Sequence, residues 1–147
     1  MNHSISNLPV LKPASRAEPV HIPLYGSKVT AGFPSPADDY VEGRLSLDEH
    51  LIQHKDSTFF VRARGNSMVE AHITDGDLLV VDKSLIPQFG DIVVAIIDGE
   101  FTVKYLVKRG DSVVLKPANA RYKEIEFKDG QELEIWGVVT STVKKFR

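Results

Sequence analysis

After Ser57 the chain consists of short runs rich in β-branched and aromatic residues, separated by polar turns. Runs of this kind predict β-strands. We expect strands at Thr58–Arg64, Leu78–Val81, Ile92–Ile97, Phe101–Lys108, Val113–Leu115 and Leu133–Val143. Asp98-Gly99 joins two of these runs at the spacing of a two-residue type I′ hairpin. The pattern therefore predicts a mainly β fold, a curled or barrel-like antiparallel sheet.

The first 39 residues show neither helical nor strand periodicity and contain six of the eight prolines. Because the residue before a proline is biased toward extended conformations, we expect a flexible N-terminal arm at residues 1–39 and a folded domain at residues 40–147. Within that domain, apolar spacing over residues 40–54 predicts one or two short helical turns, with Ser46 or Asp48 as possible caps.

Composition excludes several classes of protein. The 147 residues are 42% apolar, carry a net charge of -2 and include no cysteine. Disulfides, thiol nucleophiles and cysteine metal sites are therefore excluded, and the reducing cytoplasm is the expected compartment. The near-neutral charge argues against direct nucleic-acid binding. Apolar runs are too short for a membrane span, and no secretory signal is visible.

A serine lies where a strand is expected to end. The segment Gly65–Met68 follows a predicted strand and precedes a possible helical turn, a junction that exposes a hydroxyl and the backbone N–H groups after it. Local sequence alone favours another interpretation, because Ser67 and Glu70 form the Ser-x-x-Glu pattern of a capping box. The α/β-hydrolase elbow does not match, since its second glycine would fall at Val69.

Histidines offer two further arrangements. His50 and His54 have the helical spacing of two metal ligands, but no glutamate follows His50 directly and no third ligand is evident, so we interpret both as surface histidines. His72 is near enough in sequence to the candidate serine for a catalytic triad with Asp75 or Asp77, although nothing in the spacing selects it.

Lys104 interrupts the apolar run at residues 101–107. Strand alternation places it with Glu100, Thr102 and Lys108 on one polar face, which predicts a solvent-exposed lysine. The alternative is a buried lysine that acts as a base. That role requires a lowered pKa, which only burial of the amine provides.

Several short segments follow one another in a characteristic order: Gly32–Ala37, Gly65–Met68, Asp75–Asp77, Gly90–Val93, Glu100–Lys104 and Ile135–Val139. Each segment alone is weak evidence, but the ordered series is specific. From about Val20 to the C-terminus, the chain resembles the UmuD- and MucA-type proteins of the bacterial SOS response.

The resemblance implies a peptidase fold shared with the LexA repressor and signal peptidases, acting on its own chain without metal or cofactor. Ser67 would be the nucleophile, Lys104 the general base, and backbone amides near Met68 the oxyanion donors. The bond cut in this family maps between Ala31 and Gly32. Small residues there suit an extended backbone entering a narrow cleft.

The resemblance also implies partners. A RecA filament on single-stranded DNA would promote the cut, and the trimmed homodimer would serve a Y-family, UmuC-type error-prone polymerase. Two alternatives stay open. One is a catalytically silent polymerase-binding module, in which Ser67 only caps a turn and Lys104 faces solvent. The other is a truncated LexA-like repressor, for which we would expect a basic helix-turn-helix where the proline-rich arm stands.

Overall fold

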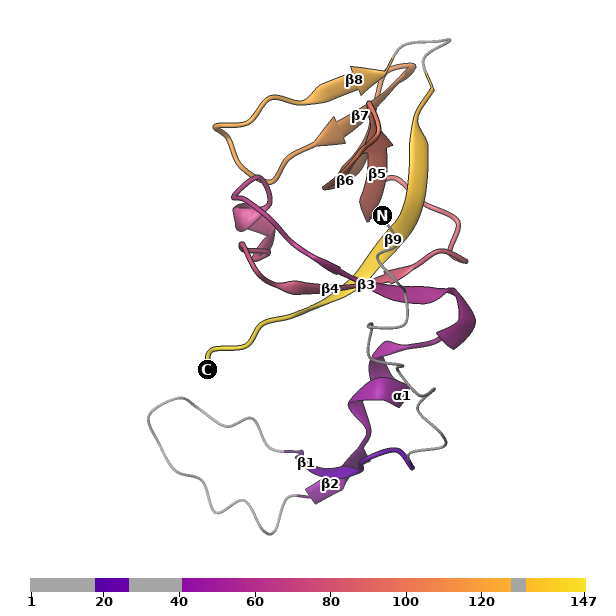
Figure 1. Ribbon diagram of the computed structural model, residues 1–147, viewed down its shortest axis with the longest axis vertical. Helices are drawn as coiled ribbons and strands as arrows, with labels where there is room; N and C mark the ends of the chain where they lie inside the picture. The colour runs from indigo at the N-terminus through magenta and orange to yellow at the C-terminus, as the bar shows by residue number, and fades with distance from the viewer. Residues whose placement is uncertain (1–17, 27–40, 128–131) are drawn as a thin grey trace, which may run out of the picture. The chain divides into compact units, whose positions relative to one another are not determined.

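The computed structural model describes residues 18–26, 41–127 and 132–147. The chain divides into two compact units, residues 1–50 and residues 51–147 (Figure 1). Antiparallel strands dominate, so the mainly β prediction is confirmed. The predicted boundary between arm and domain stays a prediction, because most of the arm lies outside the described residues. No helix in the described part of the chain is long and apolar enough to cross a membrane.

The first unit contains a two-stranded antiparallel sheet of β1 (Ile22–Tyr25) and β2 (Val41–Leu45), followed by the single-turn helix α1 (Leu47–Leu51). The sequence does not predict β1, because Pro23 lies within it and a proline is tolerated only where a strand has a free edge. The predicted helical turn is confirmed at α1, whereas the residues before it form β2.

The second unit is built on one seven-stranded sheet with the strand order β3-β4-β9-β5-β6-β7-β8. The edge strands β3 and β8 do not pair, so the sheet is curled and open rather than a closed barrel. Its strands and two 3₁₀ turns are η3 (Lys55–Ser57), β3 (Thr58–Arg62), η4 (Val69–Ala71), β4 (Leu78–Asp82), β5 (Ile92–Ile97), β6 (Glu100–Arg109), β7 (Ser112–Lys116), β8 (Ile125–Phe127) and β9 (Glu134–Val143).

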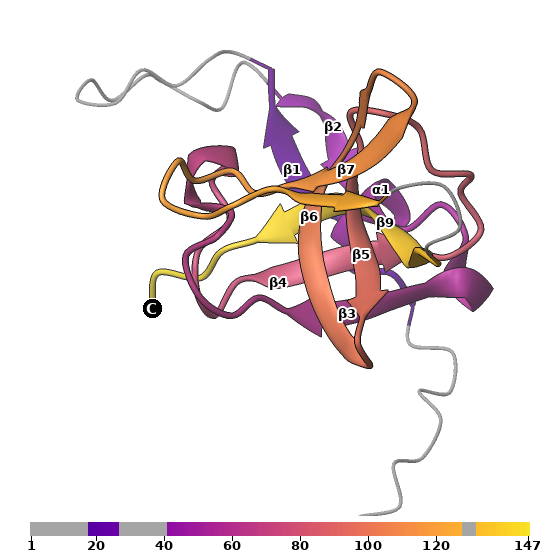
Figure 2. The same cartoon turned by 90° about the horizontal axis from the view of Figure 1, so that it is seen from above.

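The sheet bends so strongly that β3 and β4 run across the direction of β5 and β6 in both views (Figures 1 and 2). The long strand β9 joins the two halves, since it pairs with β4 and also with β5. Its register shifts in both pairings, and such bulges allow a strand to bend. Gly137 lies at this bend, where a Cβ atom would be 2.6 Å from a methyl group of Val81.

The β5–β6 hairpin fixes the position of Lys104. Asp98 and Gly99 have φ angles of 50° and 80°, as a type I′ turn requires, so this turn prediction is confirmed. The resulting register places Lys104 opposite Val93, a fully buried residue in the middle of the sheet.

Two apolar clusters form the core of this unit. One contains Val93, Ala95, Leu106, Leu115 and Val138. The other contains Ala63, Met68, Ile73, Leu79, Val81, Val94 and Ala118. Met68 and Ile73 flank η4, so these two side chains anchor the loop that follows β3 in the core.

Candidate active site

Ser67 and Lys104 meet although they are 37 residues apart in sequence. Lys104 Nζ lies 3.0 Å from Ser67 Oγ. Ser67 belongs to the turn between β3 and η4, and Lys104 comes from the middle of β6. A hydroxyl and an amine at this distance share a hydrogen bond that can carry a proton in either direction.

Lys104 is only 8% exposed, so the prediction of a solvent-facing lysine is wrong. Leu106, on the same face of β6, is buried too, which shows that this face packs inward. Lys104 Nζ also donates to Thr102 Oγ1 at 2.8 Å and to the Val103 carbonyl at 3.0 Å. Among the described residues, no carboxylate forms an ion pair with it. Burial lowers the pKa of Lys104 from its usual value.

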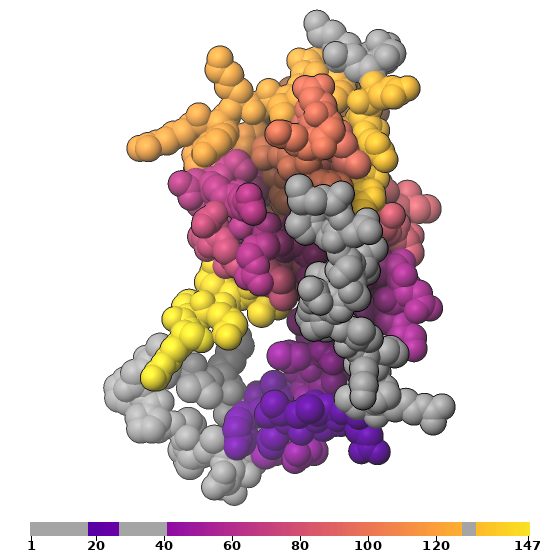
Figure 3. All heavy atoms as spheres, in the orientation of Figure 1, coloured from indigo at the N-terminus to yellow at the C-terminus, as the bar shows by residue number. Residues whose placement is uncertain are grey.

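The Ser67 loop is fixed on two sides. Gly65, with a φ of 79°, donates its backbone N–H to Asp75 Oδ1 at 2.8 Å. Met68 is 3% exposed, and its Sδ accepts the Ala118 N–H at 3.3 Å. The Glu70 N–H donates to the Ala118 carbonyl at 2.8 Å. In the space-filling view, this magenta loop lies against the orange segment that follows β7 (Figure 3).

The capping-box interpretation of Ser67 is wrong. The residue that precedes η4 is Met68, and no side chain caps this turn. The Ser67 hydroxyl contacts Lys104 instead. Within the described residues, the backbone N–H groups of Ser67 and Met68 have no hydrogen-bond acceptor.

A cavity of about 390 Å³ opens beside the Ser67–Lys104 pair. Its other lining is mainly apolar and includes Val61, Ala63, Ile73, Val94, Phe101 and Val103, with Arg62 and Arg64 also lining it. Phe101 is half-exposed and packs on Trp136, with 4.8 Å between ring centroids. This cleft suits an extended peptide with small or apolar side chains.

The histidines take other positions. His54 Nδ1 lies 2.6 Å from Asp82 Oδ2, and no group of three or more His, Asp or Glu side chains in the described part of the chain is arranged to hold a metal. The triad with His72 does not assemble, because Ser67 contacts Lys104, and Asp77 is engaged by Thr74 and Lys144. The Ala31–Gly32 bond lies outside the described residues.

The contact of Thr102 with Lys104 is not among the contacts that the sequence predicts. The available signal was their spacing of two residues on one strand, which places both side chains on the same face. The sequence did not reveal that this face is buried.

Comparison with known proteins agrees with the fold. Residues 23–140 match the Peptidase S24-like family. Protein SamA of Salmonella typhimurium is 46% identical over 136 residues, which cover 91% of this chain and 94% of SamA. Protein MucA of Escherichia coli is 45% identical over 132 residues, covering 88% and 90%. The LexA repressor of Thermotoga petrophila is 39% identical over 124 residues, covering 84% of this chain and 62% of the repressor. These matches confirm the resemblance to MucA-type proteins, and the chain belongs to the Peptidase S24-like family.

Proposed function

We propose that the chain is a serine peptidase that cuts its own backbone between Ala31 and Gly32. Ser67 is the nucleophile and Lys104 the general base. The observation that carries the proposal is the 3.0 Å contact between Ser67 Oγ and Lys104 Nζ, at a lysine that is 8% exposed. Membership of a peptidase family supports the reaction class.

The surroundings of Lys104 suit a neutral amine. A protonated lysine has three N–H donors, whereas the neutral form has two donors and one lone pair. Thr102 Oγ1 and the Val103 carbonyl accept the two donors. The lone pair is then left for the Ser67 hydroxyl, which donates its proton to Nζ when Lys104 is neutral. Burial without a carboxylate partner favours this neutral form.

The reaction proceeds in two steps. Ser67 Oγ forms a bond to the Ala31 carbonyl carbon while its proton passes to Lys104 Nζ. The carbon–nitrogen bond to Gly32 then breaks, and the Lys104 ammonium returns a proton to the leaving nitrogen. In the second step, water deprotonated by Lys104 attacks the ester on Ser67. The ester bond between Ser67 Oγ and the Ala31 carbonyl carbon then breaks, and the Lys104 ammonium returns the proton to Ser67 Oγ. This step releases the carboxyl group of Ala31 and restores the serine.

The negative charge on the Ala31 oxygen requires donors in the transition state. We assign this role to the backbone N–H of Met68, which has no acceptor among the described residues. Its position is held because the Met68 side chain is packed in the core and bonded to Ala118. Donors fixed in advance stabilise such an oxyanion strongly.

Cleavage of a tethered segment requires little intrinsic affinity. The scissile bond is part of the same chain, so its effective concentration at the cleft is set by the arm rather than by diffusion. Ala31 and Gly32 leave room for the backbone to enter a narrow cleft. One cut per molecule is the expected output, and regulation would act on docking of the arm.

The partners proposed here follow from the similarity to SamA and MucA over most of the chain. A RecA filament on single-stranded DNA would promote docking of the arm. The product, residues 32–147, would form a homodimer in the cytoplasm and serve a Y-family error-prone polymerase during the SOS response.

The test is intact-mass analysis of the purified full chain during incubation at neutral and alkaline pH, with and without RecA, nucleotide and single-stranded DNA. We expect a fragment ending at Ala31 that forms faster at high pH, because more of Lys104 is then neutral. Ser67→Ala and Lys104→Ala should abolish this fragment. Lys108→Ala, which removes an exposed lysine from the same strand, should cleave like the wild type.

Two results would contradict the proposal. One is a wild-type chain that stays whole even with RecA, nucleotide and single-stranded DNA, as a silent polymerase-binding module would. The other is a fragment that also appears in Ser67→Ala, which would point to a contaminating peptidase.

A further inference from the structure

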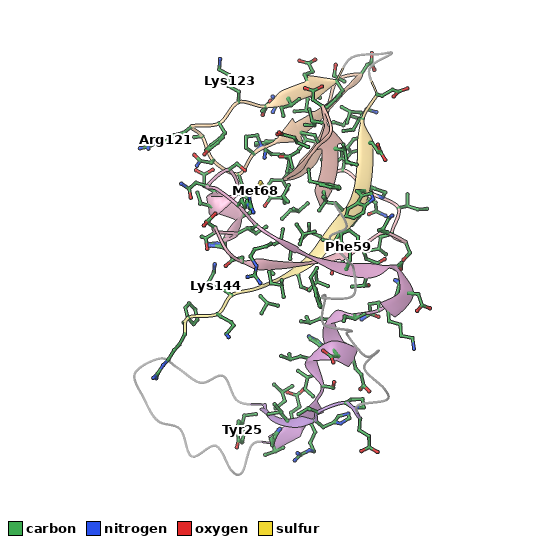
Figure 4. The ribbon with its side chains drawn as sticks, viewed as in Figure 1. Tyr25, Phe59, Met68, Arg121, Lys123 and Lys144 are labelled. Carbon is green, nitrogen blue, oxygen red and sulfur yellow. The ribbon has the colours of Figure 1, made fainter. Side chains whose placement is uncertain are left out.

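The C-terminal tail, residues 144–147, leaves the sheet beside a turn at residues 74–77. This neighbourhood follows from strand pairing, because Leu78 at the start of β4 lies opposite Val143 at the end of β9. Lys144 is the first residue of the tail. Its Nζ donates to Asp77 Oδ2 at 2.5 Å and to Thr74 Oγ1 at 2.6 Å. Figure 4 labels Lys144 on the segment that follows β9. The tail is thus bonded to the turn by a charged side chain.

The same turn holds the loop that carries Ser67. The Gly76 N–H donates to the Ala63 carbonyl, and the Ala63 N–H donates to the Asp77 carbonyl, both at 2.8 Å. Asp75 Oδ1 accepts the Gly65 N–H at 2.8 Å. Gly65 is two residues from the serine whose hydroxyl contacts Lys104. A short chain of hydrogen bonds therefore links Lys144 to the nucleophile loop.

The ion pair of Asp77 with Lys144 makes the conformation of the turn at residues 74–77 depend on Lys144. The residue is 5% exposed, and its carboxylate also accepts the Thr74 N–H at 2.9 Å. Among the described residues, Lys144 is the cation paired with it. Two other cations line the same groove, but Arg62 donates to the Gly76 carbonyl, and Lys145 forms no ion pair with any described residue. The Asp77 side chain is 6% exposed and that of Lys144 is 33% exposed. A largely buried carboxylate that loses its cation is destabilised, so the turn would rearrange toward water.

We propose that Lys144 is a positioning residue for the self-cleavage reaction. Through its ion pair with Asp77, the C-terminal tail fixes the turn at residues 74–77, and that turn fixes the Ser67 loop against Lys104. Lys144 itself touches no reacting atom. The inference rests on the proposed peptidase function, which it extends to a part of the chain distant in sequence from both members of the catalytic pair.

The experiment compares three variants of the full chain with the wild type. Lys144→Met removes the charge and keeps the length of the side chain. Lys144→Arg retains a cation that can reach the same acceptors, and Lys145→Met removes the charge of the neighbouring exposed lysine. Self-cleavage is followed by intact mass over a series of pH values, at temperatures where circular dichroism shows each variant to be folded.

We expect Lys144→Met to cleave at least tenfold more slowly than the wild type. The pH at which its rate rises should also be higher than in the wild type, because a displaced Ser67 loop admits water to Lys104 and reduces the burial that lowers the lysine pKa. A variant that is only less stable would cleave more slowly at every pH, without a shift in the pH at which the rate rises. Lys144→Arg should recover the rate to within threefold, and Lys145→Met should match the wild type.

Hydrogen exchange gives a local readout that needs no cleavage. In the Ser67→Ala background, the backbone amide hydrogens of residues 63–68 should exchange faster when Lys144→Met is added. The exchange rates of the β5 amides should not change. Equal exchange at residues 63–68, or a cleavage rate within threefold of the wild type, would overturn the role of Lys144 alone. A wild-type chain that never cleaves would instead overturn the proposed function, and this inference with it.

Discussion

Lys104 and Asp82 are two buried charged residues of the larger unit, and their surroundings differ in kind. Asp82 is 3% exposed and is surrounded by donors from His54, Ser57 and Ser84. Burial alone would raise the pKa of its carboxyl, but the hydrogen bonds from Ser84 and His54 outweigh burial and hold that pKa far below its usual range. Lys104 is almost as buried, yet burial dominates and lowers its pKa.

These surroundings suit a structural role for Asp82 and a role in the reaction for Lys104. Asp82 is kept ionised by partners, so its charge joins β4 to the segment around η3. Lys104 has hydroxyl and carbonyl neighbours but no ion-pair partner among the described residues. A buried group that is left without a counter-ion costs stability, and such groups concentrate at functional sites. Loss of Asp82 should therefore reduce stability more than activity, and loss of Lys104 should reduce activity more than stability.

Lys104→Met should have the largest effect on activity. Removal of a general base typically slows a reaction by about 100-fold or more. The free energy of unfolding should stay equal or rise, because burial of a thioether side chain of similar length costs less desolvation free energy than burial of an amine. Intact mass measures the cleavage and urea denaturation measures the stability. A loss of more than about 2 kcal/mol would make Lys104 a structural residue, like Asp82.

Asp82→Ala should behave in the opposite way. His54, Ser57 and Ser84 lose their common acceptor, so we expect the free energy of unfolding to fall by about 3 kcal/mol. Cleavage by the folded protein should stay within threefold of the wild type. Urea denaturation at low temperature, combined with the mass assay, measures both.

The dependence of stability on acid pH gives a second test of Asp82. The hydrogen bonds lower the pKa of Asp82 in the folded state. The stability that they contribute is therefore present above the pKa of an aspartate in the unfolded chain, about 4, and is lost as the pH falls below that value. Asp82→Ala should therefore lose less stability than the wild type on acidification. An equal acid response in both proteins would contradict this assignment.

Gly137→Ala tests packing at the bend of β9. The new methyl group would lie 2.6 Å from the fully buried Val81 side chain and 3.3 Å from the Asp82 carbonyl. Overpacking of this kind costs about 2 kcal/mol. Gly43→Ala is the matched control, because a Cβ atom there meets nothing within 4 Å. In thermal denaturation, Gly137→Ala should melt at a lower temperature than Gly43→Ala. Equal melting temperatures would show that the bend accommodates a methyl group.

Thr102→Val should have the smallest effect. Loss of one hydrogen bond to Nζ lets the Lys104 amine rotate away from Ser67, and one such bond corresponds to about a tenfold change in rate. Stability should change little, since valine has a similar shape and suits a strand. The mass assay measures the rate, and an unchanged rate would show that the Val103 carbonyl suffices to orient Lys104.

Much of the fold was readable from the sequence because strand periodicity is local. The predicted strands from β3 to β7 and β9 occur within a few residues of their expected bounds. The short strand β8 (Ile125–Phe127) lies in a polar stretch and gives no periodic signal. The β1–β2 pair was missed for another reason. Its first strand contains Pro23, and its pairing depends on residues about 20 positions away.

Less of the site than of the fold can be predicted from the sequence, because the site depends on tertiary packing. Alternation correctly places Thr102 and Lys104 on one face of β6, but the sequence of one strand does not reveal which face packs inward. Likewise, Ser67 and Glu70 match a capping box locally, whereas the core position of Met68 moves the start of η4 by one residue. The pairing of Ser67 with Lys104 was expected only through resemblance to a family.

The most direct test of this account is a titration of Lys104 itself. In the full chain carrying Ser67→Ala, which should stay whole, heteronuclear NMR of a labelled lysine side chain reports its protonation against pH. The same signal in the urea-unfolded chain gives the reference. We predict that Lys104 loses its proton at a clearly lower pH in the folded protein than in urea. A midpoint equal to or above the unfolded value would contradict the account, because Lys104 would then remain an ammonium ion and could not take the proton of Ser67.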